Sequence, residues 1–393
     1  MLYIFTKYLV RAGLFFFCRR IVFSDTKILA KQGPLLLACN HPNSFFDALL
    51  LGAYFNKPVH FLARGDAFRN PFAVKILTAF KAIPIYRLRE GKQYLALNDA
   101  TFEKCTAILK EGGIVLIFTE GLCLHQWKLR PLKKGTARIA LNVWKEEEMQ
   151  QRFRVLPVSF NYSSFKSFGK NVVIHFGMPL GYNQPLNQAT EAEQMLELNR
   201  NISAELEKGM LIEENDDGSV RFLLSNLNRK KKNNKASLIN FLQERLLKLR
   251  SSQLEPSFLK LSENKVYPSG NVEMMLTLIS LVFLAAPAII GFALNLPLYL
   301  PLQSVLKKKT EGTVFYHSAL FVVLIITYPI YTLLLGLLLS LIWPSVSFLV
   351  WVMYIPTTAF CASVFFDKAI AIKNYLSLSG DDRKIIESVT GKA

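Results

Sequence analysis

Two long stretches near the C-terminal end of this 393-residue chain carry no charged side chain at all. Residues 274–306 and 313–366 contain no Asp, Glu, Lys or Arg. A helix needs about 20 apolar residues to cross a bilayer, where each backbone polar group must be satisfied within the protein. The second stretch is long enough for two such helices, with the turn near Trp343-Pro-Ser345. This part of the chain therefore predicts membrane helices.

The first charge-free stretch is harder to assign, because its 33 residues exceed one span and fall short of two. It also contains Pro287, Pro297 and Pro301. Basic residues follow both stretches, and basic flanks tend to stay in the cytoplasm, so each stretch should return to the side it left. We therefore predict a proline-kinked re-entrant or interfacial segment at about 274–304 and a helical hairpin at about 315–366. The alternative is three helices that each cross the membrane.

The chain is both strongly basic and strongly apolar. It has 47 Lys and Arg against 29 Asp and Glu, a formal charge of +18, and 51% hydrophobic residues. This combination fits an anionic membrane surface, whereas a nucleic-acid-binding domain is expected to be basic and polar. The five cysteines are scattered without a C-x-x-C pair, which argues against a zinc site and a disulfide framework. We therefore expect membrane lipids as partners, no nucleic acid and no bound metal.

Apolar, polar and charged segments divide the chain into five predicted parts. Lys7 and Arg11 lie four residues apart on one face of the apolar N-terminal segment, which predicts an interfacial helix. A helix packed into the core is the alternative. The predicted parts are an interfacial amphipathic helix at 1–23, a catalytic domain at 24–220, a basic amphipathic linker at 221–272, the membrane region at 273–367, and a cytoplasmic tail at 368–393.

Short β-rich runs alternate with longer helical stretches between Lys31 and about Phe176. Such alternation predicts an α/β fold with a mixed, largely parallel sheet flanked by helices. The predicted strands are 35–39, 59–63, 83–86, 114–118, 155–160 and 172–176. In open sheets of this kind, ligands gather at the carboxyl ends of the strands. Polar side chains after these runs are therefore candidates for a functional site.

The sequence Asn-His-Pro-Asn-Ser-Phe-Phe-Asp follows the first predicted strand and contains His41 and Asp47. This spacing suits a base that removes a proton from a hydroxyl while an acid holds its ring in one tautomer. Ser44 to Asp47 alone also fits a capping box that opens a buried helix. Six steps along a continuous helix would place Asp47 about 120° around from His41. We therefore expect Pro42 and Asn43 to form a turn and Ser44 to cap the helix that carries Asp47.

Three further segments place polar residues or proline at predicted strand ends. Arg87 follows one strand, Glu120 and Gly121 follow another, and Pro157 interrupts a third. A cationic patch lies ten to fourteen residues after Glu120, and its members are Arg130, Lys133 and Lys134. Each has a simpler alternative: Arg87 could end a strand in solvent, Glu120-Gly121 could be a turn, and Lys133-Lys134 could be a solvated helix start.

Together these segments resemble four sequence blocks of the glycerolipid acyltransferases, which acylate glycerol 3-phosphate, lysophosphatidic acid and related acceptors. The blocks are Asn40-His41 with Asp47, Tyr86-Arg87, Phe118-Thr-Glu-Gly121 and Leu156-Pro-Val158. The resemblance covers about residues 30–180. The chain departs from the family in the first block, which has five residues between the histidine and the aspartate instead of the usual four.

The resemblance implies that His41 accepts the proton of a glycerol hydroxyl as this hydroxyl attacks the carbonyl of an acyl thioester. Asp47 would orient His41 and stabilise the imidazolium, as in the serine-hydrolase triad but with the substrate as nucleophile. The resemblance also implies that Arg87, Glu120 and Gly121 help to position the phosphate-bearing acceptor. Glu120 cannot pair with phosphate, so it would fix a basic residue or accept a glycerol hydroxyl. Arg130 and its patch suit a phosphate of the acceptor or of coenzyme A.

We therefore predict a membrane-bound O-acyltransferase whose catalytic domain lies on the cytoplasmic face. Its donor would be acyl-CoA or acyl-carrier protein, its acceptor 1-acylglycerol 3-phosphate, and no cofactor would be needed. Glycerol 3-phosphate is the alternative acceptor. A non-catalytic membrane scaffold is the alternative of another class. A transporter is disfavoured, because the C-terminal stretches lack ionisable residues that could form a pathway for charged substrates.

Overall fold

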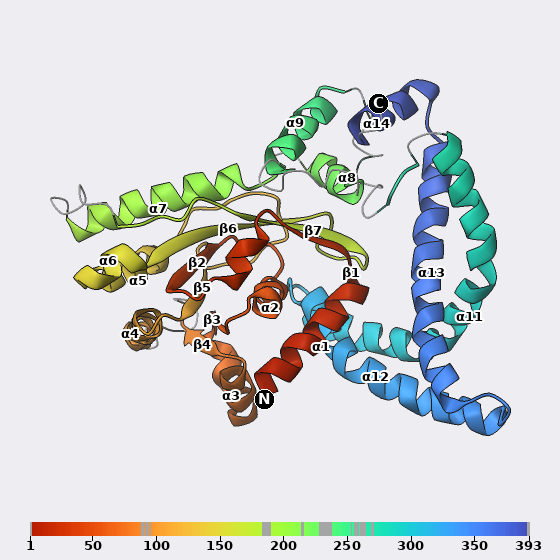
Figure 1. The fold of residues 1–393 in the computed structure, drawn as a ribbon, viewed down its shortest axis with the longest axis horizontal. Helices are drawn as coiled ribbons and strands as arrows, with labels where there is room; N and C mark the ends of the chain where they lie inside the picture. Colours follow the sequence, from red (N-terminus) through yellow and green to blue (C-terminus); the bar gives the residue numbers. More distant parts are fainter. Residues whose placement is uncertain are drawn as a thin grey trace.

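The structure is a computed structural model that describes residues 2–390 with gaps at 88–90, 92, 94–95, 183–189, 214–215, 228–237, 253, 255–258, 260–264 and 269–270. The basic run of the predicted linker, residues 229–235, lies outside the described residues. Figure 1 shows a sheet domain flanked by helices and, at one end of this domain, a group of long helices from the C-terminal third.

A seven-stranded sheet in the order β1-β7-β6-β2-β5-β3-β4 forms the centre of the sheet domain. All neighbouring strands are parallel except β6 and β7. The strands are β1 (Cys18–Phe23), β2 (Leu35–Cys39), β3 (Val59–Arg64), β4 (Ala82–Ile85), β5 (Ile114–Phe118), β6 (Arg154–Tyr162) and β7 (Lys170–Phe176). The predicted mixed, largely parallel sheet is therefore confirmed.

Helices cover both faces of this sheet. Leu35, Leu37 and Cys39 of β2 face one apolar cluster, while Leu36 and Ala38 face the other. A strand buried on both faces reads as a continuous apolar run, as this one does. The first cluster contains residues of α1 (Leu2–Phe17), α2 (Phe45–Tyr54), α8 (Ser219–Ser225) and α9 (Leu238–Arg250). The second contains residues of α4 (Leu97–Lys110), α5 (Lys134–Trp144), α6 (Glu147–Arg152) and α7 (Glu191–Lys208). A further helix, α3 (Pro71–Ala79), lies between β3 and β4 in the chain.

The N-terminal helix is shorter than predicted, because α1 ends at Phe17 and Cys18–Phe23 forms β1. The prediction of one helix over residues 1–23 is therefore wrong for the last part. Arg19 and Arg20 interrupt the apolar pattern, and the β-branched Ile21 and Val22 pair well as an edge strand beside β7. Arg19 forms an ion pair with Asp367, far along the chain in the membrane region.

The remaining helix α1 has two different faces. Lys7 donates a hydrogen bond to the carbonyl of Phe55, and Arg11 donates to the carbonyls of Ala53 and Tyr54 at 2.6 and 3.2 Å. These carbonyls end α2, where cations are favoured by the helix dipole. The other face exposes large apolar side chains, namely Ile4, Phe5, Tyr8, Phe15 and Phe16. The helix thus packs on α2 with its basic residues and leaves an apolar face uncovered.

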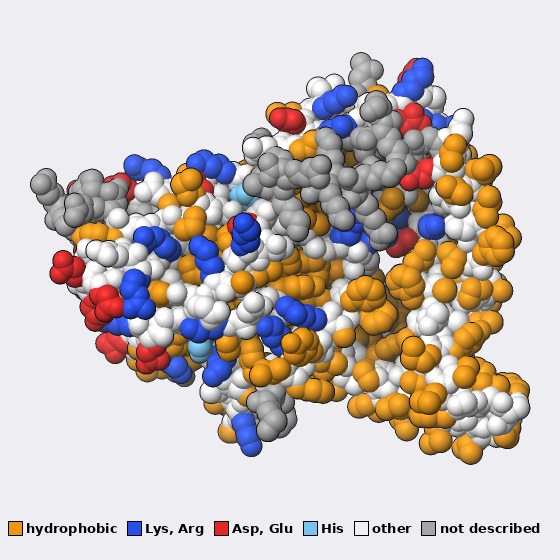
Figure 2. All heavy atoms as spheres, in the orientation of Figure 1, with side chains coloured by type: hydrophobic (Ala, Val, Ile, Leu, Met, Phe, Trp, Pro, Cys, Tyr) orange, Lys and Arg blue, Asp and Glu red, His pale blue; other side chains and the backbone are white. Residues whose placement is uncertain are grey.

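Three C-terminal helices are long and apolar enough to cross a membrane: α11 (Asn271–Thr310), α12 (Tyr316–Ile342) and α13 (Phe348–Leu376). The last helix of the chain, α14 (Gly380–Thr390), follows them. The turn predicted near Trp343 is confirmed, because it joins α12 and α13. Figure 2 shows hydrophobic side chains gathered over these three helices and charged side chains concentrated on the sheet domain.

The segment predicted to be re-entrant is part of one 40-residue helix, α11, with Pro287, Pro297 and Pro301 inside it. Such a helix is about 60 Å long, twice the hydrocarbon thickness of a bilayer. The helix continues through the prolines and bends, and Figure 1 shows the bend. Gly291 lies where α11 and α13 approach closely, since a Cβ there would come 2.0 Å from the carbonyl oxygen of Thr358.

Candidate active site

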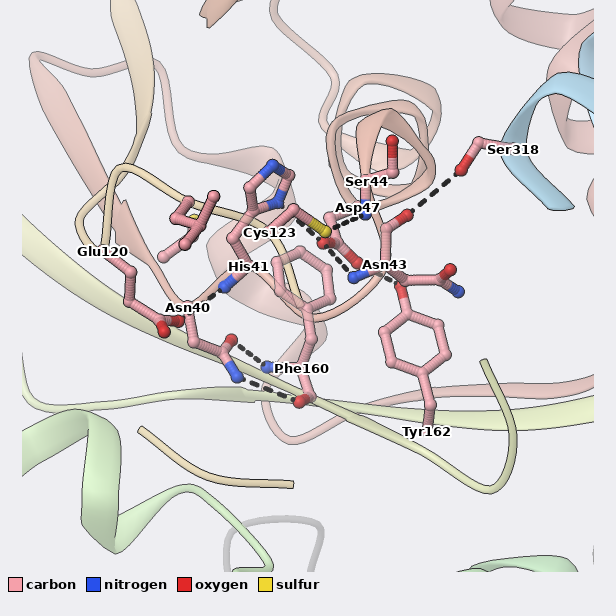
Figure 3. A network of polar contacts seen from close by, with 12 residues as sticks. Asn40, His41, Asn43, Ser44, Asp47, Glu120, Cys123, Phe160, Tyr162 and Ser318 are labelled. Carbon is pink, nitrogen blue, oxygen red and sulfur yellow. Dashed lines mark hydrogen bonds and ion pairs between the residues drawn. The ribbon is translucent and has the colours of Figure 1, made fainter. Parts of the chain in front are cut away.

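The candidate site lies at the carboxyl end of β2, at the centre of the sheet. Asn40 anchors the chain there, because its side chain accepts from the Phe160 amide at 2.8 Å and donates to the Phe160 carbonyl at 3.2 Å. His41 comes next, and its backbone N–H donates to Oε1 of Glu120 at 2.9 Å. The His41 ring stacks on Phe118 of β5 with the ring centroids 3.6 Å apart. Both neighbouring strands therefore hold the chain around His41 (Figure 3).

His41 and Asp47 are in direct contact, with Nδ1 3.0 Å from Oδ2. A carboxylate can only accept, so Nδ1 carries the hydrogen and Nε2 of a neutral ring keeps its lone pair. The His41 side chain is 16% exposed, and Nε2 has no hydrogen-bond partner among the described residues. In the neutral ring, this arrangement leaves Nε2 able to accept a proton from a bound hydroxyl.

Asp47 is fully buried and accepts two further hydrogen bonds. The backbone N–H of Asn43 donates to Oδ2 at 2.9 Å, and the hydroxyl of Tyr162 donates to Oδ1 at 2.5 Å. Burial and then the neighbouring Asp47 raise the pKa of Tyr162 well above its usual value, so this hydroxyl stays protonated and remains a donor. A buried carboxylate with three donors is held in one orientation.

The turn expected at Pro42 and Asn43 is present as a bend, and α2 begins at Phe45. Ser44 occupies the cap position with φ 57° and ψ −151°, a region that residues other than glycine rarely adopt. Its side chain makes no capping hydrogen bond, so the predicted side-chain cap is absent. Instead, the Ser44 N–H donates to Sγ of Cys123 at 2.9 Å. The five residues between His41 and Asp47 include this strained bend, which lets the two side chains meet.

Cys123 is a nucleophilic side chain close to the pair, because its sulfur accepts from the Ser44 N–H. Burial and then the nearby Asp47 raise the pKa of its thiol. The thiol is therefore protonated at neutral pH, and a protonated thiol is a poor nucleophile. This chemistry argues against Cys123 as a covalent nucleophile.

Glu120 links His41 to Arg130. Oε1 of Glu120 accepts from the His41 backbone, and Oε2 accepts from Nε of Arg130 at 2.7 Å. Arg130 also donates to the carbonyl of Leu122, while its Nη1 is buried without a hydrogen-bond partner in the described structure. Gly121 turns the chain with φ 65°, and a Cβ there would lie 3.0 Å from Cγ of Lys133. The sequence left open whether Glu120-Gly121 is a turn or Glu120 fixes a basic residue. The structure shows both, because Gly121 turns the chain and Glu120 binds Arg130.

Lys133 and Lys134 are exposed at the start of α5. The Lys133 N–H donates to the carbonyl of Thr119 at 2.8 Å, which brings this helix start next to the carboxyl end of β5. A helix N-terminus attracts anions through its free N–H groups and dipole. The patch is thus a solvated helix start that also lies beside Glu120.

Arg87 lies two residues beyond β4, at the outer edge of the sheet. Two strands, β5 and β3, separate β4 from β2. At about 4.8 Å per strand, Arg87 begins about 14 Å from the strand that carries His41. It therefore lies at the same sheet edge as the pair, on the outermost strand of that side.

Sequence reasoning missed three residues of the site, namely Tyr162, Cys123 and Ser318. Ser318 lies in α12 and donates to the Asn43 carbonyl. Tyr162 ends β6, the strand beside β2, so a polar residue at this strand end was a usable signal. No comparable signal marked the other two. In the described part of the chain, no group of three or more His, Cys, Asp or Glu side chains is placed to hold a metal ion.

Residues 20–161 match the family model described as acyltransferase, and this segment contains His41, Asp47 and Glu120. No curated protein matches the chain. Among solved structures, the chain is similar to the crystal structure of the 1-acyl-sn-glycerophosphate (LPA) acyltransferase PlsC from Thermotoga maritima. The two share 20% sequence identity with a TM-score of 0.37 over 52% of this chain and 75% of that chain.

Proposed function

We propose that this chain, an acyltransferase by the family domain at residues 20–161, transfers a fatty acyl chain from an acyl thioester to the hydroxyl of 1-acylglycerol 3-phosphate. In this proposal the enzyme is bound to the membrane through its C-terminal helices. Its sheet domain lies on the cytoplasmic face, where the basic residues flanking the helices are expected. The donor is acyl-CoA or acyl-carrier protein, and no cofactor takes part.

One observation carries the chemical step: His41 directs its protonated Nδ1 at Asp47 and leaves Nε2 without a partner among the described residues. We propose that Nε2 takes the proton from the acceptor hydroxyl while the hydroxyl oxygen bonds to the thioester carbonyl carbon. The carbon–sulfur bond then breaks, and the imidazolium returns the proton to the departing thiolate. Asp47 stabilises the imidazolium in between.

The cations beside His41 support an acceptor with a phosphate group. Nη1 of Arg130 is buried without a partner in the described residues, although the other side of this guanidinium is fixed by Glu120 and Leu122. A guanidinium binds phosphate oxygens through directed hydrogen bonds. Lys133 and Lys134 add charge at the start of α5. We propose that this group binds the acceptor phosphate or the phosphates of coenzyme A, and that Arg87 contributes from the outer edge.

The surroundings favour a lipid acceptor over the water-soluble glycerol 3-phosphate. The site lies next to α12, one of the helices apolar enough to cross a membrane. The exposed apolar face of α1 is suited to lie among lipid headgroups and acyl chains. An acceptor that already carries one acyl chain could reach His41 from the bilayer without passing through water.

The test is an assay of the purified full chain in detergent micelles with acyl-CoA or acyl-carrier protein as donor. We expect turnover of 1-acylglycerol 3-phosphate, and we expect His41→Ala to slow it at least about a hundredfold. Turnover of glycerol 3-phosphate alone would overturn the proposed acceptor. If the wild type and the His41→Ala variant were equally active, the mechanism would be overturned. If neither protein transferred an acyl group, the result would favour a scaffold.

A further inference from the structure

We infer that the first turns of α12 are part of the active site, and that Ser318 is a positioning residue for the His41–Asp47 pair. This inference rests on the proposed function, because it concerns the same reaction. The family match ends at residue 161, so α12 lies wholly outside it. The membrane region would then do more than attach the enzyme to a bilayer.

The contact that carries the inference joins Ser318 to Asn43. The Ser318 hydroxyl donates to the Asn43 carbonyl at 3.2 Å, although the two residues are 275 positions apart in the sequence. Both residues are fully buried. The backbone N–H of Asn43 in turn donates to Oδ2 of Asp47, the same oxygen that contacts Nδ1 of His41. Asn43 is therefore held by α12 through its carbonyl and holds Asp47 through its N–H (Figure 3).

Aromatic packing seats this end of α12 on the site. The buried Phe321 meets Phe46 edge-on with centroids 5.1 Å apart, and it meets Phe17 at 5.0 Å. Phe46 immediately precedes Asp47 in α2. Phe315, just before α12, stacks near Phe45 at 6.5 Å. The helix therefore contacts the segment that carries Asp47 on several sides, and Ser318 lies in the middle of this contact.

Helix α1 completes the contact from the other side. A Cβ on Gly13 would come 2.7 Å from the side chain of Ile325, so α1 and α12 touch closely at this glycine. Arg64, at the end of β3, lies over the ring of Phe315 at 5.2 Å. These contacts fix where α12 begins relative to the sheet, and hence where the Ser318 hydroxyl lies.

The bend at Ser44 explains why the hydrogen bond from Ser318 to Asn43 matters. A residue other than glycine with φ 57° and ψ −151° is strained, and it keeps this conformation only when its surroundings enforce it. The bend has the Cys123 sulfur on one side and the Ser318 hydroxyl on the other. Removing the hydrogen bond from Ser318 should let the Asn43 peptide shift, and Asp47 would lose its fixed relation to His41.

The experiment compares Ser318→Ala with Ser340→Ala in the full chain in detergent micelles. Ser340 is the matched control, because it lies in the same helix and bonds only to carbonyls of its own helix, those of Gly336 and Leu337. For Ser318→Ala we expect kcat of acyl transfer to fall about tenfold with KM unchanged. Hydrogen–deuterium exchange of the peptide covering residues 40–47 should become faster, since its amides lose protection. For Ser340→Ala we expect neither change.

An unchanged kcat for Ser318→Ala would overturn the inference. So would a loss of activity that comes with a lower unfolding midpoint and a raised KM, because that pattern marks a general loss of structure. If the wild type transfers no acyl group, the proposed function fails. The exchange measurement then still reports whether Ser318 holds residues 40–47.

Discussion

The hydroxyl of Tyr162 lies 2.5 Å from Oδ1 of Asp47, the carboxylate oxygen that His41 leaves free. The carboxylate is thus divided between two tasks: Oδ2 orients the imidazole, and Oδ1 is fixed by a buried phenol. Tyr162 ends β6 and His41 follows β2, and these strands are neighbours in the sheet. The sheet itself therefore sets the angle at which Asp47 meets His41.

Tyr162→Phe should lower kcat about tenfold and leave KM unchanged. The substitution keeps the ring and removes one hydrogen bond to a charged group, which contributes about 1.5–3 kcal/mol. Asp47 would then rotate more freely, and His41 would spend less time in the orientation that accepts a proton. The measurement is steady-state acyl transfer by the purified variant. The matched control is Tyr3→Phe, whose hydroxyl bonds to the Gly52 carbonyl and the Val59 N–H and not to Asp47. Equal kcat for wild type and Tyr162→Phe would contradict a positioning role.

Some of this network could be predicted from sequence because the signals are local. The continuous apolar run before Asn40 marked β2, and the six-residue spacing required the bend that lets His41 meet Asp47. The partners that hold Asp47 could not be predicted in the same way. Tyr162 is 115 positions away and Ser318 meets Asn43 across 275 positions, so both contacts depend on sheet order and helix packing.

Ser44→Gly should raise the unfolding midpoint and keep the acyl-transfer rate within about twofold. Glycine adopts the Ser44 backbone angles without strain, which otherwise costs on the order of 1–3 kcal/mol. The buried Ser44 hydroxyl has no partner among the described residues, so its removal also ends a desolvation cost. Ser203→Gly in the helix α7 is the control and should lower the midpoint. A lower midpoint for Ser44→Gly as well would show that the bend is not strained.

Arg130→Lys should lower kcat/KM at least about tenfold. A lysine has one ammonium nitrogen, so it cannot reproduce the planar arrangement in which Nε of Arg130 donates to Glu120 and Nη2 donates to the Leu122 carbonyl while Nη1 is left for a ligand. Glu120 would then hold the His41 backbone less firmly, and the acceptor phosphate would lose a directed donor. Arg152→Lys is the control, because Arg152 forms an exposed pair with Glu148 within one helix. Unchanged kcat/KM for Arg130→Lys would exclude a geometric role for the guanidinium.

The membrane region shows a second limit of sequence reasoning. Length and composition predicted the hairpin of α12 and α13, because about 20 apolar residues suffice for a span. The same counting favoured a proline-kinked re-entrant or interfacial segment at about 274–304. The structure has one long bent helix there, and whether this helix re-enters or spans the membrane stays a prediction. At the other end of the chain, the apolar pattern through Phe17 gave no sign of the change to β1 at Cys18. That change depends on β7, which lies far along the chain and pairs with β1.

Glu213→Gln should stabilise the protein near pH 8 and have little effect near pH 4.5. Burial, and then the neighbouring carboxyl of Asp217, raise the pKa of Glu213 from 4.5 to about 7. Between these values the folded state binds more protons than the unfolded state, so the free energy of unfolding falls as pH rises from about 4.5 to about 7. Above pH 7 the buried carboxylate is ionised, and the loss is on the order of 3 kcal/mol.

Glutamine is neutral throughout this range, so the variant should keep the stability that the wild type loses. Thermal unfolding midpoints of both proteins near pH 4.5 and pH 8 measure the effect. Glu197→Gln is the control, because Glu197 is exposed on α7. A gain for Glu213→Gln that is the same at both pH values would show that lost packing or hydrogen bonding, not ionisation of Glu213, sets the difference.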